Sequence, residues 1–263
     1  MLSAFEWQKH NGSIRMITDR SGKEYFESIG LSSVWNGIDV YPDDMEGHVD
    51  PFLFWAAGKL RALKNMPVPC VMLDTDLIVW KNIDDLTEGF DITAAHPEEI
   101  NDEVYPDPHC FKLKDGYAFP DKWDFLLQAA NTAFLCIMDR AFRDSYVAAA
   151  ENFIENVKPD GLDPVKAMCF AEQRILPVCA KAEGMKLGYL LDADKLDEQE
   201  IMTHTWGFKQ ILDTVPEAEH QFCMRCVKRI AEDFQKRLHL LKKCRDLSKY
   251  YHEYMNISNG DNE

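Results

Sequence analysis

Two carboxylates interrupt an otherwise apolar segment, VMLDTDLIVW at residues 71–80, and this interruption constrains the fold more than any other feature of the chain. An unpaired carboxylate removed from water is very costly, so a buried strand does not normally run through Asp74 and Asp76. We expect the strand to end there, with both side chains at the carboxyl ends of the strands, where open α/β sheets bind ligands.

The close spacing of these carboxylates predicts a cation. Asp74 and Asp76 repel each other unless a positive charge bridges them, and oxygen ligands favour Mg²⁺ or Mn²⁺. Diphosphate oxygens would complete the coordination shell. The segment therefore predicts a divalent metal that holds a phosphorylated substrate.

The composition limits the class of protein. The 263 residues suit one sizeable α/β domain with an appendage, and an apolar fraction of 46% is typical of a packed globule. The net charge of -16 argues against a nucleic-acid partner, because phosphate backbones are bound by basic surfaces. The sequence contains no apolar run of transmembrane length and does not begin with the pattern of a secretory signal. Eight scattered cysteines fit a reducing cytoplasm.

Strands and helices are expected to alternate along the first two thirds of the chain. Short apolar segments predict strands at 14–18, 70–74, 92–96, 133–138 and 186–191. Asp and Pro starts and apolar periodicity predict helices at 23–29, 52–64 and 140–157, and one from Asp163-Pro164 that Pro177 should interrupt or kink. The segment 97–121, rich in Pro, Asp, Tyr and His, predicts a long functional loop.

The carboxyl-terminal part predicts one long charged helix over about 216–254. Its apolar residues recur at near-helical spacing, so we expect this stripe to pack on the rest of the domain or on a partner helix, which leaves a homo-oligomer open. The expected organisation is a domain over 1–212 followed by a helical extension over 213–263.

Several segments in order resemble glycosyltransferases of the GT-A fold. FWAAGKLRALKNMPVPCVMLDTDLIVWKNIDDL is similar to the central segment of the glycogenin and bacterial lipopolysaccharide galactosyltransferase group, and to related bacterial proteins that are poorly characterised. The resemblance runs from about Ile14 to Lys209. It rests also on four short patches, MITD (16–19), Asn131-Thr132-Ala133, Glu172-Gln173 and HTWGFK (204–209). It implies an α/β fold with a mostly parallel central sheet flanked by helices.

The resemblance implies a role for each matching residue. Asp74, Asp76 and His204 would bind Mn²⁺ or Mg²⁺. Glu172, Gln173 and Asn131 would lie beside the sugar. Contacts with the nucleotide-sugar donor would come from Asp19, Lys59, Thr75, Gly207 and Lys209. The implied reaction is sugar transfer from a nucleotide-diphosphate donor to a glycan, lipid or protein acceptor, and the resembling families mostly retain the anomeric configuration.

The sequence departs from the family pattern in three places. Ala133 replaces a glycine, and Lys209 falls one residue early. These folds also usually open with a nucleobase-binding strand, whereas only MLSAFEWQKHNGS precedes MITD here and predicts a helix anchored by Trp7.

Two other functions stay open at this point. A chain without the first strand could be a non-catalytic GT-A-like protein that binds sugars or partners. A haloacid-dehalogenase-type phosphohydrolase also uses Asp-x-Asp, but normally on the first strand and followed by Thr or Val, where this chain has Ile78.

Overall fold

A computed structural model describes residues 1–41, 49–196 and 198–260, and the chain divides into two compact units. The first, called here the terminal unit, is made of Met1–Val40, Thr75–Asn82 and Glu200–Glu263. The second, the central unit, is made of Tyr41–Asp74 and Ile83–Gln199. The architecture is mixed α/β, as expected, whereas the boundary expected at residue 212 stays a prediction.

The central unit contains a four-stranded sheet in the order β3-β6-β5-β7. Its strands are β3 (Cys70–Leu73), β5 (Ile92–Glu98), β6 (Ala129–Ile137) and β7 (Leu187–Tyr189). Strand β6 runs antiparallel to both β3 and β5, and only the β5–β7 pair is parallel. The expectation of a mostly parallel sheet is therefore wrong for this sheet. Residues 99–128 return to β5 without a crossover helix, and a direct return gives antiparallel neighbours.

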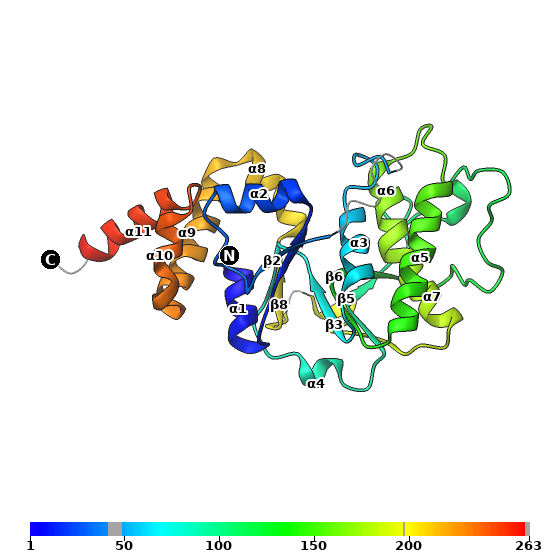
Figure 1. The fold of residues 1–263 in the computed structure, drawn as a ribbon, viewed down its shortest axis with the longest axis horizontal. Coiled ribbons are helices and arrows are strands. Elements are labelled where there is room, and N and C mark those ends of the chain that lie inside the picture. The colour runs from blue at the N-terminus through cyan, green and yellow to red at the C-terminus, as the bar shows by residue number, and fades with distance from the viewer. Residues whose placement is uncertain (42–48, 197, 261–263) are drawn as a thin grey trace. The chain divides into compact units, whose positions relative to one another are not determined.

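In Figure 1, α3 (Ala57–Asn65), α5 (Arg140–Asn156), α6 (Pro164–Cys169) and α7 (Ile175–Ala182) lie beside this sheet. The short α4 (Asp84–Thr87) lies apart from these helices and contacts β7. The predicted helix 140–157 is confirmed, since Asp139 caps α5 by accepting a hydrogen bond of 2.7 Å from the Phe142 amide. Its buried residues Phe142, Tyr146 and Phe153 share one face.

One helix begins later than expected, and a second is not α-helical throughout. The chain from Pro51 to Ala56 forms turns, and α3 begins at Ala57 rather than near residue 52. The helix from Pro164 does not stop at Pro177, but it departs from α-helical geometry just before it. A π-helical turn, Phe170–Arg174, joins α6 to α7, which contains Pro177.

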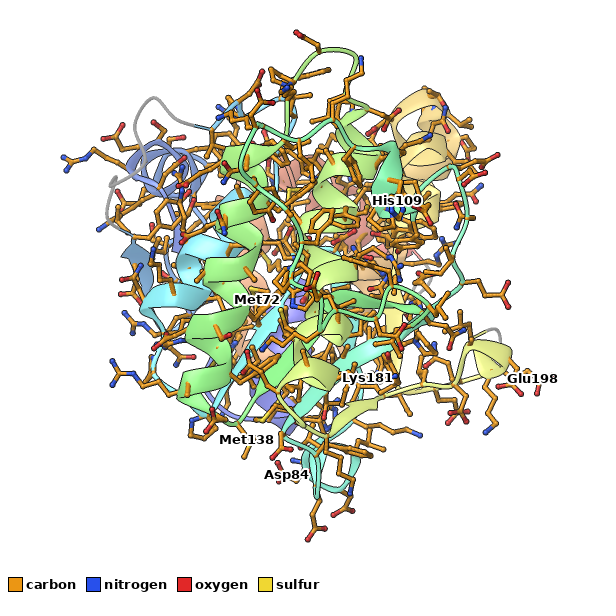
Figure 2. All side chains as sticks on the ribbon, turned by 90° about the vertical axis from the view of Figure 1, so that its right-hand side faces the viewer. Met72, Asp84, His109, Met138, Lys181 and Glu198 are labelled. Atoms are coloured by element: carbon orange, nitrogen blue, oxygen red, sulfur yellow. The ribbon has the colours of Figure 1, made fainter. Side chains whose placement is uncertain are left out.

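Aromatic side chains fill the space between the sheet and the helices. Phe153 contacts Phe111 and Phe170 with ring centroids 5.1 and 4.7 Å apart, and Phe170 lies 4.7 Å from Phe111. Met72 of β3 belongs to the same core. In Figure 2 it lies among the elements of the unit, whereas Glu198 projects at the edge of the view.

The terminal unit contains α1 (Leu2–His10), which confirms the predicted amino-terminal helix, and Trp7 is buried. Two small sheets belong to it, one with parallel β1 (Met16–Thr18) and β2 (Ile38–Val40), the other with antiparallel β4 (Leu77–Val79) and β8 (Met202–His204). Its further helices are α2 (Arg20–Ser28), α8 (Lys209–Thr214), α9 (Pro216–Asp233), α10 (Leu238–Lys243) and α11 (Ser248–Gly260).

The carboxyl-terminal segment is helical but not continuous, which corrects the expectation of one long helix. Helix α9 ends at Phe234, whose φ of -129° and ψ of 44° are not helical. The Phe234 ring lies 5.4 Å from Phe5, so packing on α1 overrides the helical propensity. Val227, Ile230 and Leu241 of the apolar stripe are buried in a core with Phe5, so the stripe packs within its own unit. Within the described ranges, a helix of the length and apolar character needed to cross a membrane is not found.

The aromatic core predicts a large effect of truncating Phe153. Phe153→Ala should lower the free energy of unfolding by about 3–5 kcal/mol, because the ring is fully buried and the cavity cannot close completely. Urea unfolding followed by circular dichroism measures this loss. Leu126→Ala is the control, because Leu126 is 93% exposed and should change the free energy by less than about 0.5 kcal/mol. Equal losses for the two variants would contradict the assigned core.

Candidate functional site

The terminal unit brings Asp76 and His204 together through the pairing of two strands. Asp76 directly precedes β4, and His204 is the last residue of β8, opposite Leu77 in the antiparallel register. The amide of Thr205 donates a hydrogen bond of 3.1 Å to the Asp76 carbonyl, which continues the ladder past the strand ends. The backbone therefore fixes this pair, although its members lie 128 positions apart in the sequence.

The Asp76 carboxylate faces two basic side chains. Its Oδ2 atom lies 3.4 Å from His204 Nε2 and 2.7 Å from Lys209 Nζ. Burial acts to raise the pKa of Asp76, but His204 and Lys209 outweigh it and hold the pKa well below its ordinary value of 3.8. Oδ2 is buried, and within the described part of the chain no donor is aligned to form a hydrogen bond with it. Its contacts with the two bases are therefore ion pairs of imperfect geometry.

The central unit gathers a second group of predicted residues around Lys59 on α3. Lys59 Nζ lies 2.7 Å from Asp74 Oδ1 and also pairs with Glu172 Oε1. Asp74 follows β3 and donates its amide to the Ala133 carbonyl at 2.8 Å. Glu172 lies on the π-helical turn and accepts a hydrogen bond of 2.7 Å from Thr132 Oγ1. One ammonium is thus shared by two carboxylates.

Charge balance in this group favours the protonated lysine. Burial acts to lower the pKa of Lys59, but the Glu172 and Asp74 carboxylates outweigh it and raise the pKa well above 10.5. The Glu172 side chain is only 4% exposed, and its polar contacts are with Lys59 and Thr132. With one positive and two negative groups, the cluster keeps a net charge of -1 and would attract a further cation.

Gln173 and Asn131 are held by residues that the sequence did not single out. Tyr105 Oη donates a hydrogen bond of 2.6 Å to Gln173 Oε1, and Asn131 Nδ2 donates one of 3.2 Å to Glu98 Oε1. Tyr105 belongs to the segment predicted as a functional loop, and that was the available signal for it. Its burial could not be anticipated from its polar neighbours.

The remaining predicted residues are not part of these two groups. Asp19 caps α2, with its carboxylate accepting a hydrogen bond of 2.5 Å from the Gly22 amide, so a structural role accounts for it. Thr75 is exposed on the segment between β3 and β4. Gly207 is also exposed, and a side chain added there would meet open space. Their donor contacts stay predictions.

Removing the lysine of the central group should destabilise the protein. Lys59→Met leaves Glu172 buried without its charge partner, so we expect a loss of about 3 kcal/mol at neutral pH, measured by urea unfolding. Adding Glu172→Gln to this variant should recover part of the loss. Lys64→Met is the matched control, because Lys64 lies on the same helix and its pair with Glu151 is a surface pair of under about 1 kcal/mol. A loss no larger for Lys59 than for Lys64 would contradict the buried ion pair.

Asp76 should make stability depend on pH in the acid range. Because its folded pKa lies below 3.8, the unfolded chain binds the proton more tightly, and the stabilisation present above pH 3.8 is lost as the pH falls. In buffer with a chelator, Asp76→Asn should therefore lose about 1 kcal/mol less than the unmodified chain between about pH 6 and pH 3. Parallel curves for the two proteins would show that Asp76 is not stabilised by its bases. The exposed Asp213→Asn variant is the control and should follow the unmodified chain.

Comparisons with known proteins give one match. Among curated proteins and among solved structures, nothing matches the chain. A protein-family model described as "Family of unknown function (DUF6734)" matches residues 1–255, nearly the whole sequence. The chain therefore belongs to the DUF6734 family.

Proposed function

We propose that the chain is a metal-dependent glycosyltransferase of the GT-A type, which transfers a sugar from a nucleotide-diphosphate donor to a glycan, lipid or protein acceptor. The observation that carries the proposal is the Asp76 carboxylate. Its buried Oδ2 faces an imidazole and an ammonium and lacks an aligned hydrogen bond from the described residues. A buried charge in that state is costly, and a bound cation would satisfy it.

The donor atoms fit Mn²⁺ or Mg²⁺. Asp76 offers a carboxylate oxygen and His204 an imidazole nitrogen, and an imidazole suits Mn²⁺ better than Mg²⁺. Asp74 stands two residues before Asp76, so the chain itself keeps their Cα atoms within about 7 Å of each other. Asp74 is the third ligand that the resemblance implies. When bound, the ion would act as a Lewis acid toward the diphosphate leaving group.

Lys209 is suited to bind the diphosphate. Lys209 is the first residue of α8, and its side chain is 58% exposed. Its ammonium lies 2.7 Å from Asp76 Oδ2. A cation taking over the charge of Asp76 would release the ammonium to pair with a phosphate oxygen. Lys209 would then neutralise negative charge that grows on the leaving group.

Gln173 is a better candidate than Glu172 for contact with the sugar. Glu172 is enclosed by Lys59 and Thr132, whereas Gln173 is only partly buried. Because Tyr105 donates to the Oε1 atom of Gln173, the amide orientation is fixed and its Nε2 group remains as a donor toward a substrate oxygen. Glu172 would not contact the sugar. It would hold the Lys59 ammonium in position and contribute negative charge to the group.

Thermal unfolding with nucleotides tests the metal and the donor together. UDP, GDP and ADP are each added with and without Mn²⁺, and a nucleotide at about a hundred times its dissociation constant should stabilise the chain by about 2.7 kcal/mol. We expect stabilisation by one nucleotide, dependent on Mn²⁺ and abolished by Asp76→Asn. Asp213→Asn, a matched change at an exposed position, should leave it intact. If no nucleotide stabilises the chain in either condition, the proposal is wrong.

Product analysis then separates transfer from binding alone. With the corresponding nucleotide sugar, release of nucleoside diphosphate that requires Mn²⁺ and Asp76 would support transferase chemistry. Metal-dependent binding without turnover of any donor would indicate the non-catalytic sugar-binding alternative. Release of inorganic phosphate from simple phosphomonoesters would instead indicate the phosphohydrolase.

A further inference from the structure

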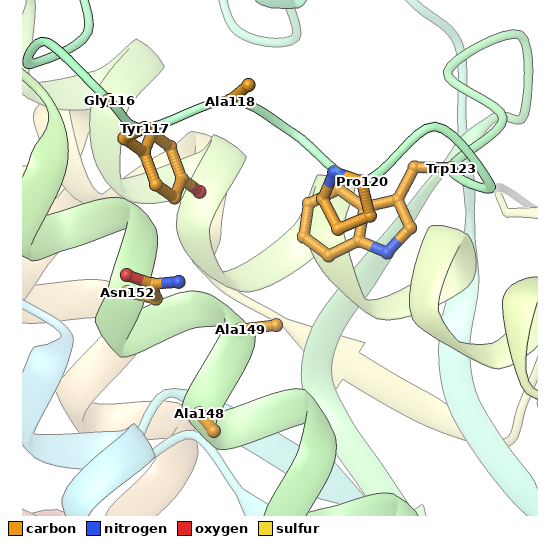
Figure 3. A pocket seen from close by; sticks show the side chains of 8 residues that line it. All are labelled: Gly116, Tyr117, Ala118, Pro120, Trp123, Ala148, Ala149 and Asn152. Carbon is orange, nitrogen blue, oxygen red and sulfur yellow. The ribbon is translucent and has the colours of Figure 1, made fainter.

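The central unit contains a pocket whose lining residues belong to neither group of candidate residues (Figure 3). Its volume is about 300 Å³, and it opens between the loop 116–123 and helix α5. The lining residues are Gly116, Tyr117, Ala118, Pro120, Trp123, Ala148, Ala149 and Asn152. Pockets for small molecules begin near this size, so it suits a ligand of about one ring.

The wall of the pocket is held in place by the core. Trp123 stacks on Phe119 at 5.9 Å, and Phe119 stacks on the buried Phe153 at 6.1 Å. Beyond Trp123, the guanidinium of Arg174 donates a hydrogen bond of 2.7 Å to the Phe125 carbonyl and another to the Leu127 carbonyl. Arg174 is fully buried, so this anchor fixes the loop from the inside. The aromatic wall is therefore pre-formed.

The lining chemistry selects a neutral ligand. Of the described residues, those that line the pocket are apolar or carry uncharged polar groups. Asn152 uses its Oδ1 atom to accept a hydrogen bond of 2.8 Å from Asn156, which leaves its Nδ2 group as a donor. Burial, and to a smaller extent Cys179, raises the pKa of Tyr117 to about 12, so its hydroxyl stays protonated at neutral pH. The pocket thus combines apolar surface with hydrogen-bonding groups at its edge.

The ring angles favour a sugar over a flat aromatic molecule. Tyr117 lies at 74° to Phe119, whereas Trp123 lies at 28° to the same ring, so Tyr117 and Trp123 are steeply inclined to each other. Inclined walls cannot stack on both faces of a nucleobase. A pyranose ring presents C–H groups to one aromatic wall and hydroxyls to Tyr117 and Asn152, and it needs no second parallel ring.

We propose that this pocket binds one neutral hexopyranose unit of a carbohydrate. Aromatic and proline surfaces would cover the apolar face of the ring, and the small side chains of Ala148 and Ala149 leave the volume that the ring would occupy. The proposal does not depend on the transferase function. If both hold, the site would retain a glycan at a position separate from the reaction.

Nuclear magnetic resonance of the complete chain tests this site directly. The probes are D-glucose, D-galactose and N-acetyl-D-glucosamine, each titrated to about 100 mM, because a single sugar ring binds at the weak, millimolar end of the affinity scale. We expect at least one of them to shift the indole N–H signal of Trp123, which Trp123→Phe identifies by its disappearance. The proposal is overturned if the Trp123 signal moves with none of the sugars. It is also overturned if adenosine binds with a lower dissociation constant than every sugar.

A filling variant shows whether the shift comes from the pocket. Ala148→Phe places a ring in the cavity and should weaken sugar binding about tenfold or more, since the ring displaces the ligand from its aromatic contact. Ala141→Phe is the matched control on the same helix, because Ala141 is exposed and does not line the pocket. Equal affinity in the two variants overturns the proposal. The Asp76→Asn variant should bind the sugar with unchanged affinity, which shows that the pocket is separate from the Asp76 site.

Discussion

A carboxylate removed from water must be matched by positive charge, and this constraint shapes both groups of candidate residues. In the central unit, Lys59 meets it for Glu172 and Asp74. In the terminal unit, His204 and Lys209 meet it for Asp76, but with poor hydrogen-bond geometry at one buried oxygen. Glu6 Oε2, buried beside Lys9 and His10, is in the same state. The geometry at Asp76 therefore supports a bound cation only in combination with the ligand roles that the resemblance implies for Asp76 and His204.

The sequence was most informative where a local interaction determines the structure. Asp139 and Asp163 were recognised as helix caps, and both accept the expected backbone hydrogen bonds. Ends of strand β3 and of helix α5 were placed within a residue or so for the same reason. The break of an apolar run at Asp74 and Asp76 was also a local signal. Because burying an unpaired carboxylate is costly, two such residues in an apolar segment indicate the end of a buried strand.

Features set by distant partners were beyond the reach of the sequence. The direction of β6 depends on how residues 99–128 return to the sheet, and no local pattern encodes that path. The end of helix α9 at Phe234 follows from its contact with Phe5, more than 200 residues earlier. Tyr105 became a candidate only when the fold placed its hydroxyl on Gln173.

The π-helical turn at Phe170–Arg174 has a consequence for how this segment tolerates change. An α-helix advances about 100° per residue, so the wider turn offsets the side chains that follow it from those that precede it. Glu172 pairs with Lys59 on α3, whereas Arg174, two positions later, donates to carbonyls of the segment 125–127. Deleting one residue would let the turn close to an ordinary α-helix, so α7 could keep its place on the sheet. The same deletion would remove the offset that lets Glu172 and Arg174 reach separate partners, so the extra residue of the turn serves these two side chains rather than the helix.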